Sequence, residues 1–385
     1  MTNKALKNIG VLTLANGLSQ TISIVGALYI PRVLGPESYG NYSTVLAFVA
    51  LFSLVSFSGL DKVIIRSAAK NPSTTKVLMD LFLGLKILCS VMATLVCLLS
   101  LIFISYDSAL TIYIAVYSMS LLMNPSVAFL NIAYQSSERL KYMASVTVFQ
   151  NLLTVSLSIL LVYFGYGIMA LIICRLFVIA LTLLLSYQIL RSQFFSLTLK
   201  LNWKWDRRMI IQGLRFSALQ FFNTLSTRID IVMLSLMATS AEVGIYALAY
   251  NICDKILTLR SGISTSVFPN YAKKGNELTF GKLLQHSSML LIPSLAIIVI
   301  VLLSGDWIIL NLIGIEYQSS VDVLVVLIFY LFFNFAVIPF GIFLQSTNHE
   351  KMVIKVVVIK SILNIALNYV LYQHIGIIGI AISTL

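Results

Sequence analysis

The sequence predicts an all-α integral membrane protein built from two pseudo-symmetric six-helix lobes, with the last helix truncated. Three observations carry this prediction. Apolar residues make up 59% of the 385 residues and charged residues only 10%, apolar stretches of span length recur along the chain, and its two halves resemble each other. Soluble proteins carry about 25% charged residues, so soluble enzymes, nucleic-acid-binding proteins and disordered chains are excluded.

The apolar stretches define the expected spans, since a helix needs about 20 mostly apolar residues to cross the hydrocarbon core. A twelfth stretch begins near residue 375 and reaches Leu385 after about ten residues, or about 15 Å of helix, so we expect the chain to be a fragment. The eleven complete stretches lie at residues 9–30, 42–60, 78–104, 110–133, 142–164, 166–190, 209–237, 242–268, 284–304, 321–345 and 353–373.

The basic residues set the expected orientation. Loops on one side of the membrane hold 18 Lys and Arg residues, and loops on the other side hold only Arg32. Because basic residues are concentrated in cytoplasmic loops, this bias predicts a cytoplasmic N-terminus and explains the net charge of +12. The four cysteines fall inside apolar stretches, so we expect buried thiols and not disulfides.

The two halves of the chain align as an internal repeat. At an offset of 204, Gly40 and Tyr42 meet Gly244 and Tyr246, and five polar positions of residues 13–23 meet five of residues 217–227. The pattern predicts one lobe at residues 1–200 and a second at 201–385, which holds five complete spans and a partial sixth. An even number of spans in each lobe makes the repeat parallel, as in transporters that alternate access between two lobes.

The matched polar stripes are the first candidate site. Their spacing puts each set on one helical face, where hydrogen-bonding groups suited to sugars would line a water-filled cavity. Hydrogen bonding between packed helices is the alternative, and it stays open. The candidate residues are Asn16, Gln20, Ser23, Gln220, Asn223, Thr224 and Thr227.

Charged residues near mid-membrane are the second candidate site, because a charge there is costly. Asn251, Asp254 and Lys255 share one face of the expected span 242–268. Arg228 and Asp230 flank the polar face of the span before it. The functional interpretation is contact with an anionic substrate by the bases and coupling to an ion by Asp230 or Asp254, and the alternative is a set of structural ion pairs.

Further bases lie inside expected spans. Arg175 sits near the middle of the span 166–190, which makes it a candidate for contact with an anionic substrate. Lys86 and Lys360 each lie about eight residues from the cytoplasmic end of their own span, where a long side chain can also reach the interface.

Catalytic motifs are absent from the sequence. It has no phosphate-binding P-loop, no Cys/His cluster and no carboxylate-rich outer loop. We therefore expect a protein that is not an enzyme and that holds no metal and no cofactor.

The stretch from Arg32 to Tyr42, RVLGPESYGNY, and its counterpart at residues 241–247, AEVGIYA, resemble polysaccharide and O-antigen flippases of the Wzx type, within the multidrug/oligosaccharidyl-lipid/polysaccharide exporter superfamily. The resemblance implies a flippase of lipopolysaccharide biosynthesis in the inner membrane. Its substrate would be an oligosaccharide linked through pyrophosphate to undecaprenol. Implied partners are this substrate, membrane lipids, a polysaccharide polymerase and a chain-length regulator, with no nucleic acid. The cationic cavity of relatives implies a role for Lys255, and less directly for Arg175, Arg228 and Lys360.

Two other functions remain as alternatives. A drug or cation antiporter of the same superfamily would take a cationic substrate, but seven buried bases against four buried acids disfavour one. A membrane polysaccharide polymerase or ligase would need a long outer loop with reactive side chains. The expected outer loops are short and poor in charge, which disfavours an enzyme.

Overall fold

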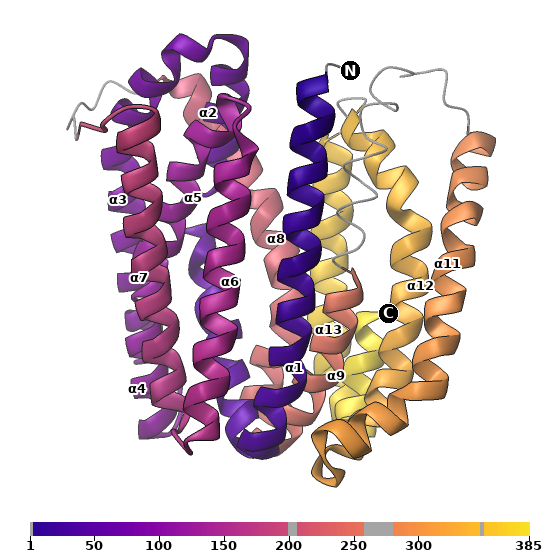
Figure 1. The fold of residues 1–385 in the computed structure, drawn as a ribbon. Helices are drawn as coiled ribbons and strands as arrows, with labels where there is room; N and C mark the ends of the chain where they lie inside the picture. The colour runs from indigo at the N-terminus through magenta and orange to yellow at the C-terminus, as the bar shows by residue number, and fades with distance from the viewer. Residues whose placement is uncertain (1–2, 199–205, 258–279, 347–349) are drawn as a thin grey trace. The chain divides into compact units, whose positions relative to one another are not determined.

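The protein is described by a computed structural model over residues 3–198, 206–257, 280–346 and 350–385 (Figure 1). All regular structure in these ranges is helical, which confirms the predicted fold class. Among the described residues, seven helices are long and apolar enough to cross a membrane, and a bent pair, Gly17–Leu54 with Gly59–Ala68, adds an eighth candidate. The expected spans at 209–237 and 242–268 correspond to α8 (Arg207–Met237) and α9 (Ser240–Leu257), which fall outside this count.

Contacts divide the chain into two compact units, one of residues 1–26 and 45–224 and the other of residues 27–44 and 225–385. Helix α1 (Asn3–Leu51) contributes to both units. It joins the first two expected spans and is interrupted at Gly35, which has φ 73°. A left-handed residue directly before Pro36 fits this break, because proline disfavours a helical conformation in the residue that precedes it. The repeat-based lobes at 1–200 and 201–385 stay a prediction.

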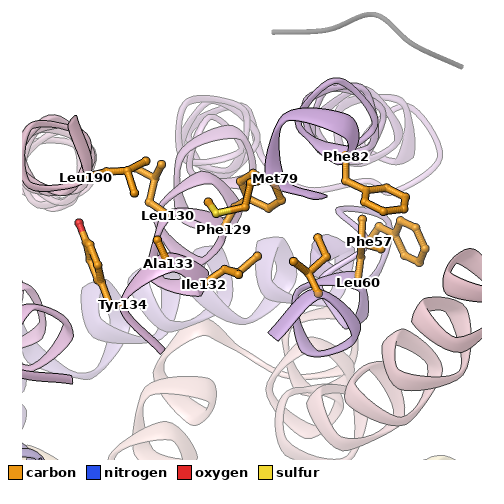
Figure 2. Packing of buried hydrophobic residues seen from close by; sticks show 11 residues of the cluster. Phe57, Leu60, Met79, Phe82, Phe129, Leu130, Ile132, Ala133, Tyr134 and Leu190 are labelled. Carbon is orange, nitrogen blue, oxygen red and sulfur yellow. The ribbon is translucent and has the colours of Figure 1, made fainter. Parts of the chain in front are cut away.

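The first unit packs its helices around a core on α3 and α5. This core brings together Met79 and Phe82 of α3, five residues of α5 between Phe129 and Tyr134, Phe57 just before α2, and Leu60 at the start of α2 (Figure 2). The helices of this unit, besides the start of α1, are α2 (Gly59–Lys70), α3 (Thr75–Ser100), α4 (Ser108–Tyr117), α5 (Ser120–Ser136), α6 (Leu140–Tyr163), α7 (Ile168–Gln193) and the first part of α8.

The second unit is formed by the end of α8, α9, α11 (Phe280–Trp307), α12 (Ser319–Ser346) and α13 (Glu350–Thr384), together with residues 27–44. A capping box starts α9. The Thr239 hydroxyl accepts a hydrogen bond from the Glu242 N–H at 3.3 Å, and the Glu242 carboxylate accepts one from the Thr239 N–H at 3.0 Å. These reciprocal bonds satisfy donors that a helix start leaves unpaired.

Residues 27–44 are held in the second unit by glycine contacts. A Cβ on Gly40 would collide with the Ser240 carbonyl, and a Cβ on Gly244 would collide with the Pro36 carbonyl. Pro36 and Gly40 correspond to Ser240 and Gly244 at the repeat offset of 204, so the contact is the same on both sides. Only glycine lets two backbones approach this closely.

The Tyr317 hydroxyl also holds this segment, by donating to the Pro31 carbonyl at 3.1 Å. Burial raises the pKa of Tyr317, which keeps the hydroxyl protonated as a donor.

Candidate functional site

A fully buried carboxylate forms the centre of a polar cluster in the second unit. Asp230 of α8 accepts three hydrogen bonds, from the Tyr246 hydroxyl of α9 at 2.9 Å, the Asn368 amide of α13 at 2.7 Å and the Thr384 hydroxyl of α13 at 2.8 Å. All three donors are neutral. A carboxylate held by neutral donors in a span can take up a proton or a small cation when those donors reorient, since hydroxyl and amide groups also carry acceptor oxygens.

The backbone of α13 builds this cluster by folding back on itself. Ile375 and Gly376 leave the helical conformation, with φ 60° at Gly376. Beyond the break, Gly379 approaches the Leu371 carbonyl so closely that a Cβ would collide with it. The Ser383 hydroxyl then donates to the Asn368 side chain. Residues 377–384, which were expected to begin a separate span, therefore pack against residues 364–371 and bring Thr384 to Asp230.

Arg228 and Asp254, which the sequence analysis assigned to different roles, form a pair in this unit. Their closest nitrogen and oxygen atoms lie 4.0 Å apart, and each side chain is about a third exposed, at 33% and 32%. An ion pair of this length and exposure contributes little to stability. Both side chains therefore keep part of their surface uncovered by the protein.

Two other predicted residues lie on α9. The Asn251 amide donates to the Tyr39 hydroxyl at 2.8 Å, so Asn251 helps to hold residues 27–44 in the second unit. Lys255 is half-buried on the same helix, one residue after Asp254.

The other predicted residues are spread over both units. Gln20 and Ser23 of α1 are half-buried, and the side-chain oxygen of Gln20 is buried with no hydrogen-bond partner among the described residues. Gln220 and Asn223 of α8 are exposed, whereas Thr224 and Thr227 are half-buried. Asn16 lies in α1, but its side chain falls outside the described part of the structure.

The bases that we expect to contact an anionic substrate belong to both units. Arg175 is half-buried on α7 in the first unit, whereas Arg228 and Lys255 belong to the second. The structure therefore brings Arg228, Asp254 and Asp230 into one unit and places Arg175 in the other.

A buried ion pair in the first unit was missed by the sequence analysis. The Lys86 ammonium lies 2.9 and 2.8 Å from the two carboxylate oxygens of Asp61, and Lys86 is only 1% exposed. The same ammonium lies 3.5 Å from the Phe57 carbonyl oxygen. Lys86 therefore does not extend to the interface. Asp61 directly follows the expected span 42–60 and Lys86 lies inside the next one, so the sequence showed both charges but not their contact.

The described residues contain no group of three His, Cys, Asp or Glu side chains that could hold a metal ion. The described clusters offer carboxylates that can exchange a proton or an ion, and Arg and Lys side chains that can contact anions.

Comparison with solved structures establishes the fold. An inward-facing multidrug-resistance MATE transporter of the MOP superfamily is similar with a TM-score of 0.79 at 14% identity, over 97% of this chain and 93% of that one. A MOP-superfamily transporter from Pyrococcus furiosus, described as having a binding pocket of reversed polarity, is similar with a TM-score of 0.70 at 14% identity, over 100% and 95%.

Sequence comparison identifies the family. A probable low-salt glycan biosynthesis flippase, Agl15 of Haloferax volcanii, is 22% identical over 162 residues, which are 40% of this chain and 34% of that protein. The matched region thus spans about a third of this relative. The family model described as polysaccharide biosynthesis protein matches residues 5–274. The chain is a multi-pass membrane protein that belongs to this polysaccharide biosynthesis protein family.

Proposed function

We propose that the chain is a flippase that moves an oligosaccharide linked through pyrophosphate to undecaprenol, an O-antigen or related repeat unit, from the cytoplasmic to the outer leaflet. The family match over residues 5–274 carries this proposal. A fold shared with transporters of the MOP superfamily supports transport over catalysis. The protein would lie in the cytoplasmic (inner) membrane with its N-terminus inside, and two six-span lobes would alternate access to the substrate.

The polar residues of α1, α8 and α9 would contact the sugars. The exposure of Gln220 and the Gln20 oxygen, which has no hydrogen-bond partner among the described residues, support this role, because such groups have hydrogen-bonding capacity left for hydroxyl groups. Lys255, Arg228 and Arg175 would attract the pyrophosphate. The partial exposure of Arg228 and its long distance to Asp254 leave its guanidinium accessible to an anion.

Asp230 is the better candidate for coupling transport to protons or sodium. Its three hydrogen-bond partners described above are neutral donors from α9 and from both arms of α13. A change in its charge would therefore change the contacts between these helices. Asp254 has an Arg228 guanidinium beside it, so its charge is already balanced in part. A polysaccharide polymerase and a chain-length regulator would use the flipped product.

The test is transport of a lipid-linked saccharide by the purified full chain in liposomes. A fluorescent undecaprenyl-pyrophosphate-linked saccharide in the inner leaflet should become accessible to a membrane-impermeant quencher faster than in empty liposomes. An imposed pH or sodium gradient should change the rate, and Asp230→Asn should abolish that change. Export of cationic drugs with no movement of the saccharide would instead support the antiporter alternative.

A further inference from the structure

A large apolar cavity lies in the first unit, outside the clusters described above. Its volume is about 650 Å³, which falls within the range of about 300–1,000 Å³ typical of small-molecule pockets. Leu54, Val55 and Phe57 of the connection before α2 form one wall, and Leu85 and Cys89 of α3 form a second. The third wall is one face of α8, from Ile210 to Phe222.

Close packing of α2 on α8 defines the edge of this cavity. The Gly59 N–H donates to the Ser217 hydroxyl at 2.9 Å, and a Cβ on Gly59 would collide with the Ser217 and Gly213 backbones. Phe57 has φ 56°, an uncommon conformation for a residue with a side chain. In this conformation the Phe57 carbonyl lies near the Lys86 ammonium, and the Phe57 ring closely approaches Gly213. These contacts hold the wall of the cavity formed by the connection before α2 in one position.

Helix α8 presents two chemically different faces. At about 100° per residue, the centre of the cavity face lies about 130° around the helix from the centre of the polar stripe at Gln220, Asn223, Thr224 and Thr227. The apolar face extends over residues 210–222, or about 18 Å at 1.5 Å per residue. Leu214 on this face is 56% exposed, so the cavity is open at its α8 side.

A positive charge marks one end of the apolar face. Arg207 begins α8 one turn before Ile210, and its position lies within about 20° of the centre of the cavity face. It is exposed. The neighbouring Arg208 is exposed too, but its position lies about 120° away from that centre. An apolar slot that ends at a guanidinium is complementary to a long hydrocarbon chain that carries a phosphate at one end.

We propose that this cavity binds the isoprenoid chain of the lipid-linked saccharide, with the pyrophosphate next to that chain held at Arg207. The inference rests on the proposed function and deepens it, because it gives the lipid part of the substrate its own site on a different face of α8 from the sugar-contacting stripe. The substrate would be captured through its tail at this site before its saccharide moves.

The experiment measures binding of undecaprenyl pyrophosphate, without sugar, to the purified full chain in detergent. Leu214→Trp fills the open side of the cavity and should weaken binding at least about tenfold, because the displaced chain loses several buried methylene groups. Leu95→Trp is the matched control, since Leu95 is similarly exposed at 53% on α3 but does not line the cavity. It should bind as the wild type does.

A second pair of variants tests the charge. Arg207→Gln should weaken binding about fivefold, whereas Arg208→Gln should not. Undecaprenol, which lacks the pyrophosphate, should lose affinity with Leu214→Trp but not with Arg207→Gln. Equal loss with Arg207→Gln and Arg208→Gln, or equal competition by phosphatidylglycerol, would overturn the assignment.

Cys89 provides a measurement that needs no substitution. It is half-buried at the cavity wall, and the other three cysteines are buried, so they give a baseline within the same molecule. Bound undecaprenyl pyrophosphate should slow alkylation of Cys89 by N-ethylmaleimide. If the wild type flips the saccharide but Cys89 is not protected and Leu214→Trp binds normally, the cavity assignment fails and the proposed function stands. If the wild type neither binds undecaprenyl pyrophosphate nor flips the saccharide, both fail.

Discussion

Breaking the Lys86–Asp61 pair should destabilise the first unit strongly. Lys86→Met leaves a carboxylate without its base, and Asp61→Asn leaves an ammonium whose described oxygen partner is the Phe57 carbonyl at 3.5 Å. The Lys86 side chain is 1% exposed and that of Asp61 11%, so water replaces the lost partner poorly. Removing one member of such a pair costs about 3–5 kcal/mol, or about two to three and a half powers of ten in the unfolding equilibrium.

The double variant, Lys86→Met with Asp61→Asn, distinguishes the energy of the interaction between the two charges from the cost of leaving one charge without its partner. Because it leaves no stranded charge, we expect its free energy of unfolding to lie within about 2 kcal/mol of the wild type. The assay is reversible unfolding in mixed detergent and SDS micelles, with the amount of protein in the membrane as a second readout. Lys62→Met is the matched control. Lys62 is an exposed lysine next to Asp61 on α2, with its ammonium 5.9 Å from the centre of the Phe216 ring. Its removal should cost about 1 kcal/mol or less of folding free energy.

Two results would refute this reasoning. If each single variant costs less than about 1 kcal/mol, the pair is solvated in the membrane protein and its burial has no energetic effect. If the costs of the single variants add in the double variant, the two charges do not interact and each acts through other contacts.

Three other predictions follow from the fold. Asp230→Asn keeps the shape of the cluster, so protein levels should stay within about twofold of the wild type while the effect of an ion gradient on transport is lost; an unchanged gradient effect would exclude Asp230 from coupling. Gly40→Ala should greatly reduce the folded protein in the membrane, because its Cβ meets the Ser240 carbonyl, whereas Gly17→Ala, with no atom within 4 Å of the new Cβ, should not. In a cysteine-free chain, a cysteine at Ser192 should stay unlabelled by an impermeant maleimide outside intact cells and one at Tyr166 should be labelled; the reverse pattern would invert the predicted topology.

Hydropathy was sufficient to place most helices, because a span shows in its own composition. The start of α3, the connection between α6 and α7, and the limits of α8 and α12 all lie within a few residues of the predicted ends. The turn at Gly165, which has φ 78°, falls between two expected spans.

Hydropathy does not show that the end of α13 folds back on the helix, because this depends on contacts between residues that are separated in the sequence. Residues after Gly376 are as apolar as a span, and only their contact with Leu371 and Asn368 shows that they fold back. The partners of Asp230 follow from this contact, so the sequence could nominate Asp230 as a costly buried charge but could not supply Thr384 as its donor. The pairing of Asp61 with Lys86 was hidden in the same way, since hydropathy scores each charge separately.

The glycine contact of residues 36–40 with residues 240–244 also bears on the history of the chain. In a homodimer with a two-fold axis, the same surface of each subunit contacts its own copy, so one residue position of the gene appears on both sides of the contact. Here a segment contacts its own repeat in the same way. In a duplicated gene the two copies become separate positions that mutate separately. Each glycine here faces main-chain atoms, which no substitution elsewhere can make smaller. After fusion, divergence could reshape the side chains around this contact, but a larger residue at either glycine would have no compensating change within reach.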